Sequence, residues 1–127
     1  MASGYRAMQE ILRRGNSPSA LFAGNDTIAV GAISALRDAN LSIPGDVAVV
    51  GFDDLPIAAY SNPRLTTVTT QAAIQGEQAA LAAIDLLNGQ RIGRRDCNLA
   101  LELIVRDSCG ASPQKSRESC KDARIAG

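Results

Sequence analysis

The segment VAVVGFDD, Val47–Asp54, decides the fold of this 127-residue chain. Its first part is almost continuously apolar and rich in valine, which is typical of a parallel strand covered on both faces. Two aspartates, Asp53 and Asp54, follow directly. The segment therefore predicts a buried strand over residues 47–52 that places two carboxyl groups at one edge of a sheet.

The residues before this strand alternate between helix and strand patterns. A short apolar run bounded by turn residues predicts a strand over 20–24. Apolar residues at helical spacing predict helices over 3–14 and 27–39. We expect Asp26 or Thr27 to cap the second helix, because either side chain can accept a hydrogen bond from the first helical turn.

The residues after the strand continue the alternation. A stretch with two prolines predicts a loop over 55–64, and the β-branched run that follows predicts a strand over 65–69. A helix is predicted over 72–88 and a further strand over 99–106. Strands separated by helices indicate an α/β fold with a mainly parallel sheet, formed by residues 1–110.

The composition excludes several classes of function. The 13 basic and 13 acidic residues cancel, so no net field attracts the chain to nucleic acid. There is no histidine and no phosphate-binding glycine loop, and we expect no catalytic residue, metal or cofactor. No apolar stretch is long enough for a membrane span or a secretory signal, which favours the cytoplasm.

The remaining polar features are consistent with a cytoplasmic globular chain. The three cysteines, Cys97, Cys109 and Cys120, are expected to be reduced thiols rather than a disulfide framework. Residues 111–127 are polar and show no periodicity, so they predict a disordered tail.

Polar residues follow two strands of the predicted sheet. A right-handed crossover between strands 20–24 and 47–52 brings both carboxyl ends to one edge, where open α/β sheets bind ligands. Asn25, Asp26 and Asp53 would lie at this edge, and Asp54 is expected to be structural or to face solvent. A turn residue with left-handed backbone is the alternative for Asn25, an Asx turn the alternative for Asp53, and a helix cap the expectation for Asp26.

Five motifs in this order resemble one family. They are Gly24-Asn25-Asp26, Ile43–Val47, Val49–Asp54, Pro63–Val68 and Leu101–Ser108. Together they are similar to the effector-binding domain of the LacI/GalR family of bacterial transcription regulators, and the resemblance covers roughly residues 3–110.

The resemblance implies a three-layer sandwich of the periplasmic-binding-protein-like type, of which this chain holds mostly the C-terminal lobe. In the family two lobes close over a small molecule, commonly a sugar or a nucleobase, and the protein is a homodimer. Only a separate N-terminal helix-turn-helix, absent from this sequence, would contact DNA. Helix 72–88 packs in the other lobe in the family, so we expect self-association here, by exchange of this helix or of strand 99–106, and weak effector binding.

The resemblance also assigns roles to individual residues. Asn25 and Asp53 match positions that contact the effector. Thr70 stands where many members carry a glutamine that reaches the effector, and here a glutamine follows at Gln71. Ala59, Tyr60 and Ser61 match a loop that joins the subunits, and Val30 and Ile33 match the same interface. A solvent-exposed loop is the alternative for Tyr60.

Two other functions remain open at this point. The chain could belong to a sugar-binding component of an uptake system, which requires a secretory signal and two lobes. It could also be an enzyme of the doubly wound class, for which consecutive aspartates supply only a weak candidate. Phe22 and Phe52 could stack on a sugar ring, but we expect both to pack in the core.

Overall fold

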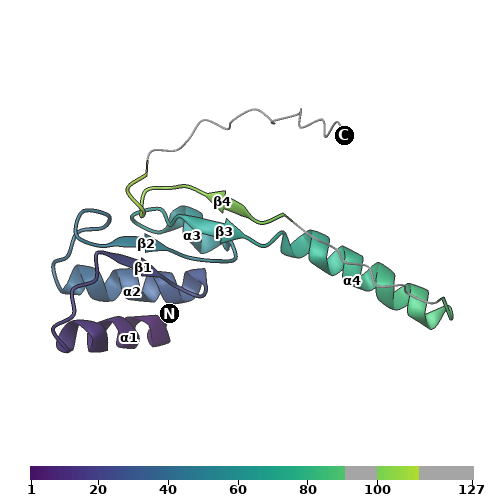
Figure 1. Cartoon of the computed structure of the whole chain (residues 1–127), viewed down its shortest axis with the longest axis horizontal. Coiled ribbons are helices and arrows are strands. Elements are labelled where there is room, and N and C mark those ends of the chain that lie inside the picture. The colour runs from purple at the N-terminus through teal and green to yellow at the C-terminus, as the bar shows by residue number, and fades with distance from the viewer. Residues whose placement is uncertain (91–99, 112–127) are drawn as a thin grey trace, which may run out of the picture.

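The computed structural model describes residues 1–90 and 100–111, and Figure 1 shows how its elements follow one another. In chain order they are α1 (Ala2–Arg13), β1 (Ala20–Phe22), α2 (Asp26–Asp38), β2 (Ala48–Val50), α3 (Pro56–Tyr60), β3 (Thr67–Thr69), α4 (Ala72–Leu87) and β4 (Glu102–Ile104). Every predicted helix and strand is present. The predicted loop over 55–64 is wrong, because it contains α3. Five residues are too few to display helical periodicity, although Pro56 at the helix start is a typical signal.

The strands form two two-stranded sheets, β1-β2 and β3-β4, and single parallel bridges join one to the other. β1 pairs with β2 in parallel. Two single parallel bridges, Val50–Thr66 and Asp53–Thr69, join β2 and the residues after it to the β3 segment. β4 pairs with β3 in the antiparallel sense. The order is therefore β1-β2-β3-β4, with β4 alone reversed among the described strands, which confirms the predicted α/β class.

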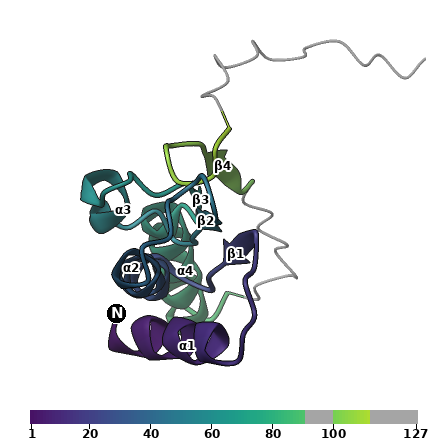
Figure 2. The ribbon, with the colours of Figure 1, turned by 90° about the vertical axis from the view of Figure 1, so that its left-hand side faces the viewer.

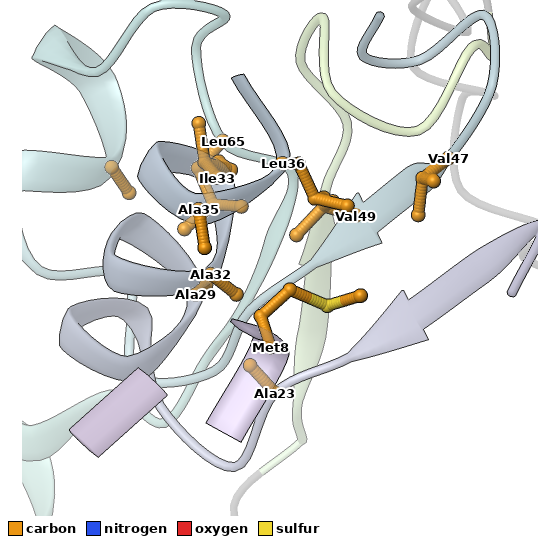
Figure 3. Close-up of a cluster of buried hydrophobic side chains, with 11 residues drawn as sticks. Met8, Ala23, Ala29, Ala32, Ile33, Ala35, Leu36, Val47, Val49 and Leu65 are labelled. Carbon is orange, nitrogen blue, oxygen red and sulfur yellow. The ribbon is translucent and has the colours of Figure 1, made fainter. Parts of the chain in front are cut away.

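One face of the strands is covered by helices. α2 packs against α1, α3 and β2 (Figure 2). The buried side chains of Met8, Leu36 and Val49 lie together between these elements (Figure 3). Burying such side chains contributes roughly 1.5 to 3 kcal/mol each, so this cluster stabilises the packing of the helices on the strands. It also sets the orientation of the strands that lead to the candidate site.

The other face of β1 is open among the described residues. Phe22 pairs with Val50 in register, so both point away from Val49 and from the helices. The Phe22 side chain is 64% exposed, and the prediction that it packs in the core is wrong. Phe52 is partly buried. The described residues thus form the sheet and one helical layer of the expected three-layer sandwich.

Helices α1 and α2 touch through their backbones. A Cβ atom on Gly4 would overlap the backbone of Ile28, and a Cβ atom on Gly31 would overlap the backbone of Met1 and Tyr5. Both glycines are buried. Their missing side chains therefore allow a close approach that an alanine at either position would prevent.

Helix α4 has no buried residue and extends away from the other elements (Figure 1). Its large apolar side chains are exposed, at Ile74, Leu81, Ile84, Leu86 and Leu87. No helix within residues 1–90 and 100–111 combines the length and the apolar character needed to cross a membrane.

Some expectations fall on residues that the structure leaves out. The predicted tail is described only at Ala111, and Cys97 and Cys120 lie outside the described residues. Cys109, which is described, is a free thiol and partly buried.

Candidate functional site

The turns that follow β1 and β2 lie side by side, next to the end of β3. The N–H of Asp26 donates to the carbonyl of Phe52, and the N–H of Asp53 donates to the carbonyl of Val68, each at 2.9 Å. These bonds join the three strand ends at one edge of the sheet. We call this edge the rim and define it as residues 25–26, 53–54 and 69–70. The prediction that both aspartate-bearing turns leave the same edge of a parallel sheet is confirmed.

Asn25 is the N-cap of α2. Its side-chain oxygen accepts hydrogen bonds from the Ile28 N–H and the Thr27 hydroxyl, each at 2.9 Å. The backbone φ of Asn25 is −160°, which is extended rather than left-handed. The expected caps, Asp26 or Thr27, and the alternative of a left-handed turn are therefore wrong. The amide nitrogen of Asn25 makes no hydrogen bond to any described residue and remains able to donate.

Asp26 is fully buried and joins three parts of the fold. One carboxyl oxygen accepts from the Thr67 hydroxyl at 2.6 Å, and the other accepts from the Leu55 N–H at 2.7 Å. A Cβ atom on Gly51 would collide with the first of these oxygens. Glycine at position 51 therefore leaves the space that the Asp26 carboxyl group fills. Asp26 holds α2, β3 and the turn after β2 together.

Asp53 and Asp54 have different environments although they are neighbours. The Asp53 side chain is partly exposed and makes no hydrogen bond within the described residues. Asp54 accepts from the guanidinium of Arg106 at 2.7 Å, in an ion pair whose side chains are 17% (Arg106) and 28% (Asp54) exposed. Asp54 is therefore structural, in agreement with one of its two expected roles. The Asp53 carboxyl group remains available to a ligand.

Thr70 and Gln71 lie where β3 leads into α4. The Gln71 side-chain amide donates to the carbonyl of Ala100 at 2.6 Å, and the Gln75 amide donates to the carbonyl of Thr70 at 2.5 Å. The displaced glutamine is thus occupied in joining the start of α4 to the segment before β4. The Thr70 hydroxyl has no partner among the described residues and is the free polar group on this part of the rim.

The residues expected at a subunit interface differ in exposure. Ile33 is 3% exposed and belongs to the core of this chain, which leaves little of its side chain for the expected interface contact. Tyr60, at the end of α3, is 87% exposed, which suits both an interface and a plain surface position. Val30, Ala59 and Ser61 are partly buried.

Three polar residues that hold the strands or their rim together could not be identified from the sequence. Thr67 contacts Asp26, and Arg106 contacts Asp54. Ser108 is fully buried, accepts from the Thr66 N–H at 2.8 Å and donates to the Val49 carbonyl at 2.6 Å. No periodic pattern marks buried polar residues, and each contact joins positions about 40 or more residues apart in the sequence. The roles of these three residues can be assigned only from the groups that they contact in the structure.

A large open hollow lies elsewhere. Its volume is about 660 Å³, and residues of α1 and α2, including Arg6, Glu10 and Asp38, line it. Asp38 is the last residue of α2, whereas Asn25 precedes the first. The hollow is therefore at the opposite end of α2 from the rim.

The chain matches known proteins along most of its length. The family model of the periplasmic binding protein-like domain matches residues 1–109. The HTH-type transcriptional repressor MelR of Bacillus subtilis is 35% identical over 115 residues, which are 91% of this chain and 33% of MelR. The HTH-type transcriptional repressor CytR of Escherichia coli is 33% identical over 87% of this chain and 33% of CytR. The chain spans about a third of the length of these curated relatives.

The fold matches a solved structure of the same kind. A LacI-type transcription regulator from Bifidobacterium animalis superposes with a TM-score of 0.80 at 33% identity, covering 86% of this chain and 39% of the other. MelR and CytR are HTH-type transcriptional repressors by name. The chain therefore belongs to the periplasmic binding protein-like domain family, and within that family it corresponds to part of the effector domain of the LacI-type transcription regulators.

Proposed function

We propose that this chain is the small-molecule-sensing and dimerisation part of a LacI-type regulator that acts in the cytoplasm, with Asn25, Asp53 and Thr70 contacting the effector. The proposal rests on a difference between residues of the rim: some have polar groups without a partner among the described residues, and others use theirs within the fold. These three residues keep an unused amide nitrogen, carboxyl group and hydroxyl among the described residues. Asp26 and Asp54, their neighbours, use their carboxyl groups within the fold.

The free groups suit a ligand rich in hydroxyls. The two oxygens of a carboxylate can accept from two adjacent hydroxyl groups, as a sugar or a nucleoside ribose presents them. A similar solved structure is a complex of the transcriptional regulator CelR with cellobiose, at 34% identity and a TM-score of 0.78. Thr70 is shorter than glutamine and offers a single hydroxyl, so we expect fewer contacts from this part of the rim. The effector class we propose is a sugar or a nucleobase, the latter in the form of a nucleoside whose ribose supplies the paired hydroxyl groups.

The test is an NMR titration of the whole chain with cellobiose, monosaccharides and nucleosides. We expect a weak ligand of one of these classes to shift the amide signals of Asn25, Asp53 and Thr70. Asp53→Asn should weaken that binding about tenfold or more, because a hydrogen bond to a charged group is lost. The control is Glu77→Gln on the exposed surface of α4, which removes the same charge about two helical turns beyond the rim residue Thr70. Equal affinity of the two variants would contradict the assignment of Asp53.

The matching change at Asn25 must preserve the helix cap. Asn25→Ser keeps an oxygen that accepts from the Ile28 N–H but removes the free amide nitrogen. We therefore use it in the same titration, in place of Asn25→Ala.

The exposed face of α4 supports self-association. Large apolar side chains at Ile74, Leu81 and Ile84 are 43%, 47% and 53% exposed and lie on one side of the helix. Contiguous apolar surface of this kind is rarely left open to water. Tyr60, with Val30, Ala59 and Ser61, is the second candidate contact. We propose a homodimer or a higher oligomer.

Sedimentation velocity at micromolar concentration tests the proposed self-association. We expect the chain to sediment as a dimer or larger, and the pair of changes Leu81→Glu and Ile84→Glu to shift it toward monomer. The control is Ala79→Glu, which adds a charge on the opposite side of the same exposed helix. A single sharp monomer boundary for the unaltered chain would refute the proposal.

A further inference from the structure

The turn after β2 has a disfavoured backbone. We call residues 53–55 the aspartate turn. Asp53 has φ +99° and the next residue, Asp54, has φ +51°, and neither is a glycine. In this region the Cβ atom of an L-residue crowds the backbone, so two such residues in succession persist only where other contacts hold them.

Contacts on two sides hold the aspartate turn. On one side, the buried Asp26 accepts from the Leu55 N–H at 2.7 Å. On the other side, the Arg106 guanidinium donates to the Asp54 carboxyl group at 2.7 Å. Asp53 directly precedes the two residues, Asp54 and Leu55, that make these contacts. Its N–H is bonded to Val68 and its side chain is free of partners among the described residues.

Arg106 is itself fixed in place. A second guanidinium nitrogen donates to the carbonyl of Leu65 at 2.8 Å, and the backbone N–H of Arg106 donates to the Thr66 hydroxyl at 2.9 Å. The planar guanidinium therefore binds the start of the β3 segment and the aspartate turn at the same time. The single ammonium of a lysine could not hold both in this geometry.

We propose that Arg106 is a positioning residue for the rim. It keeps Asp54 engaged, and so keeps the aspartate turn in the conformation that leaves the neighbouring Asp53 carboxyl group free at the strand ends. The inference that Arg106 aids effector binding rests on the proposed function, whereas the inference that Arg106 holds the conformation of the aspartate turn does not. Because Arg106 follows β4, this contact also couples that strand to the rim.

The test is Arg106→Lys in the whole chain, followed by amide hydrogen exchange measured by NMR. We compare the Asp53 N–H, bonded to Val68, with the Ala23 N–H, bonded to Val50 on the far side of β2. Exchange at Asp53 should accelerate about tenfold more than at Ala23, as expected when a charge-assisted hydrogen bond is weakened. Equal acceleration at both sites would indicate only a general loss of stability and would overturn the proposal.

A matched pair of charges provides the control. Arg64 and Asp107 form a similar ion pair at 2.7 Å, but its side chains are 62% and 45% exposed. The hydrogen bonds from Arg64 also lower the pKa of Asp107. We expect Arg64→Lys to leave exchange at Asp53 unchanged. An acceleration as large as that of Arg106→Lys would overturn the proposal.

A second variant shows whether Arg106 acts through Asp54. Asp54→Asn should by itself accelerate exchange at Asp53, and adding Arg106→Lys to it should change the rate by less than about twofold. Two fully additive effects would overturn the proposal. Asp54→Asn also keeps the test open if Arg106→Lys folds poorly, because it alters only the partner carboxyl group.

A cellobiose titration of the same variants separates this inference from the proposed function. If Asp53 exchange accelerates and cellobiose binding weakens in parallel, both are supported. If exchange accelerates as expected but neither cellobiose nor the other sugars and nucleosides bind the unaltered chain, the positioning role is supported and the proposed effector contact fails.

Discussion

Asp26→Ala is expected to lower the free energy of unfolding by about 3 kcal/mol, because it leaves the Thr67 hydroxyl and the Leu55 N–H without their acceptor. Asp26→Asn should cost about 2 kcal/mol. Its amide oxygen can accept from the Leu55 N–H and its amide nitrogen can donate to the Thr67 hydroxyl, so the loss comes from replacing two charge-assisted hydrogen bonds by neutral ones. Urea denaturation of both variants measures these losses.

Asp38→Asn is the control for this experiment. Asp38 lies at the opposite end of the same helix, is exposed, and accepts one hydrogen bond from the Tyr5 hydroxyl at 2.6 Å. An asparagine can still accept that bond, so stability should change by less than about 0.5 kcal/mol. A loss for Asp26→Asn no larger than that for Asp38→Asn would show that the buried contacts contribute nothing.

Thr67→Val extends the test to the partner residue. If the Asp26–Thr67 bond carries part of the loss, the double variant Asp26→Ala with Thr67→Val should be less destabilised than the sum of the two single variants. Additive losses would assign the effect of Asp26 to its other contact, with the Leu55 N–H.

Gly31→Ala is expected to lower the free energy of unfolding by about 2 kcal/mol, although alanine is the better helix former. The new methyl group would overlap the backbone of Met1 and Tyr5, so α1 would have to move away from α2. That movement would loosen the contact of Met8 with the core. Thermal unfolding should show the loss as a lower midpoint temperature.

Gly76→Ala is expected to have the opposite effect and to raise the free energy of unfolding. Gly76 lies inside the exposed helix α4, and a Cβ atom there would meet no other atom within 4 Å. This variant should therefore stabilise its helix by about 0.5 to 1 kcal/mol. If Gly31→Ala were also stabilising, the backbone contact between α1 and α2 would not exist as described.

Gly4→Ala probes the same contact from the other helix. Its methyl group would overlap the backbone of Ile28 in α2. Because either substitution separates the helices, the second should add little once the first is present.

Local sequence patterns predict most of the elements. The apolar run at 47–52 specifies a buried strand, and the helices that flank it specify parallel neighbours by the length of the crossover. These features together also place the two aspartate-bearing turns at one edge of the sheet. The motifs that resemble the LacI/GalR regulators point to the family that the comparisons establish.

The assignment of individual side chains within those elements is less accurate. Asn25 and Asp26 are adjacent polar residues before a helix, and local rules favour Asp26 as the cap. In the structure Asn25 caps the helix and Asp26 is buried, because Thr67 lies 41 positions later and offers a hydroxyl to it. Similarly, Ile33 belongs to the core and Phe22 is exposed.

The sequence by itself therefore determined which segments become helices and strands, the parallel sheet and the edge at which the polar turns emerge, because these depend on periodicity and on short connections. Only the tertiary structure decided that Asp26 and Asp54 are bound within the fold while the Asp53 side chain has no partner among residues 1–90 and 100–111, and that Arg106 contacts the aspartate turn. The physical reason is that a hydrogen bond depends on the distance between residues in space, and these partners lie about 30 to 50 positions apart in the chain.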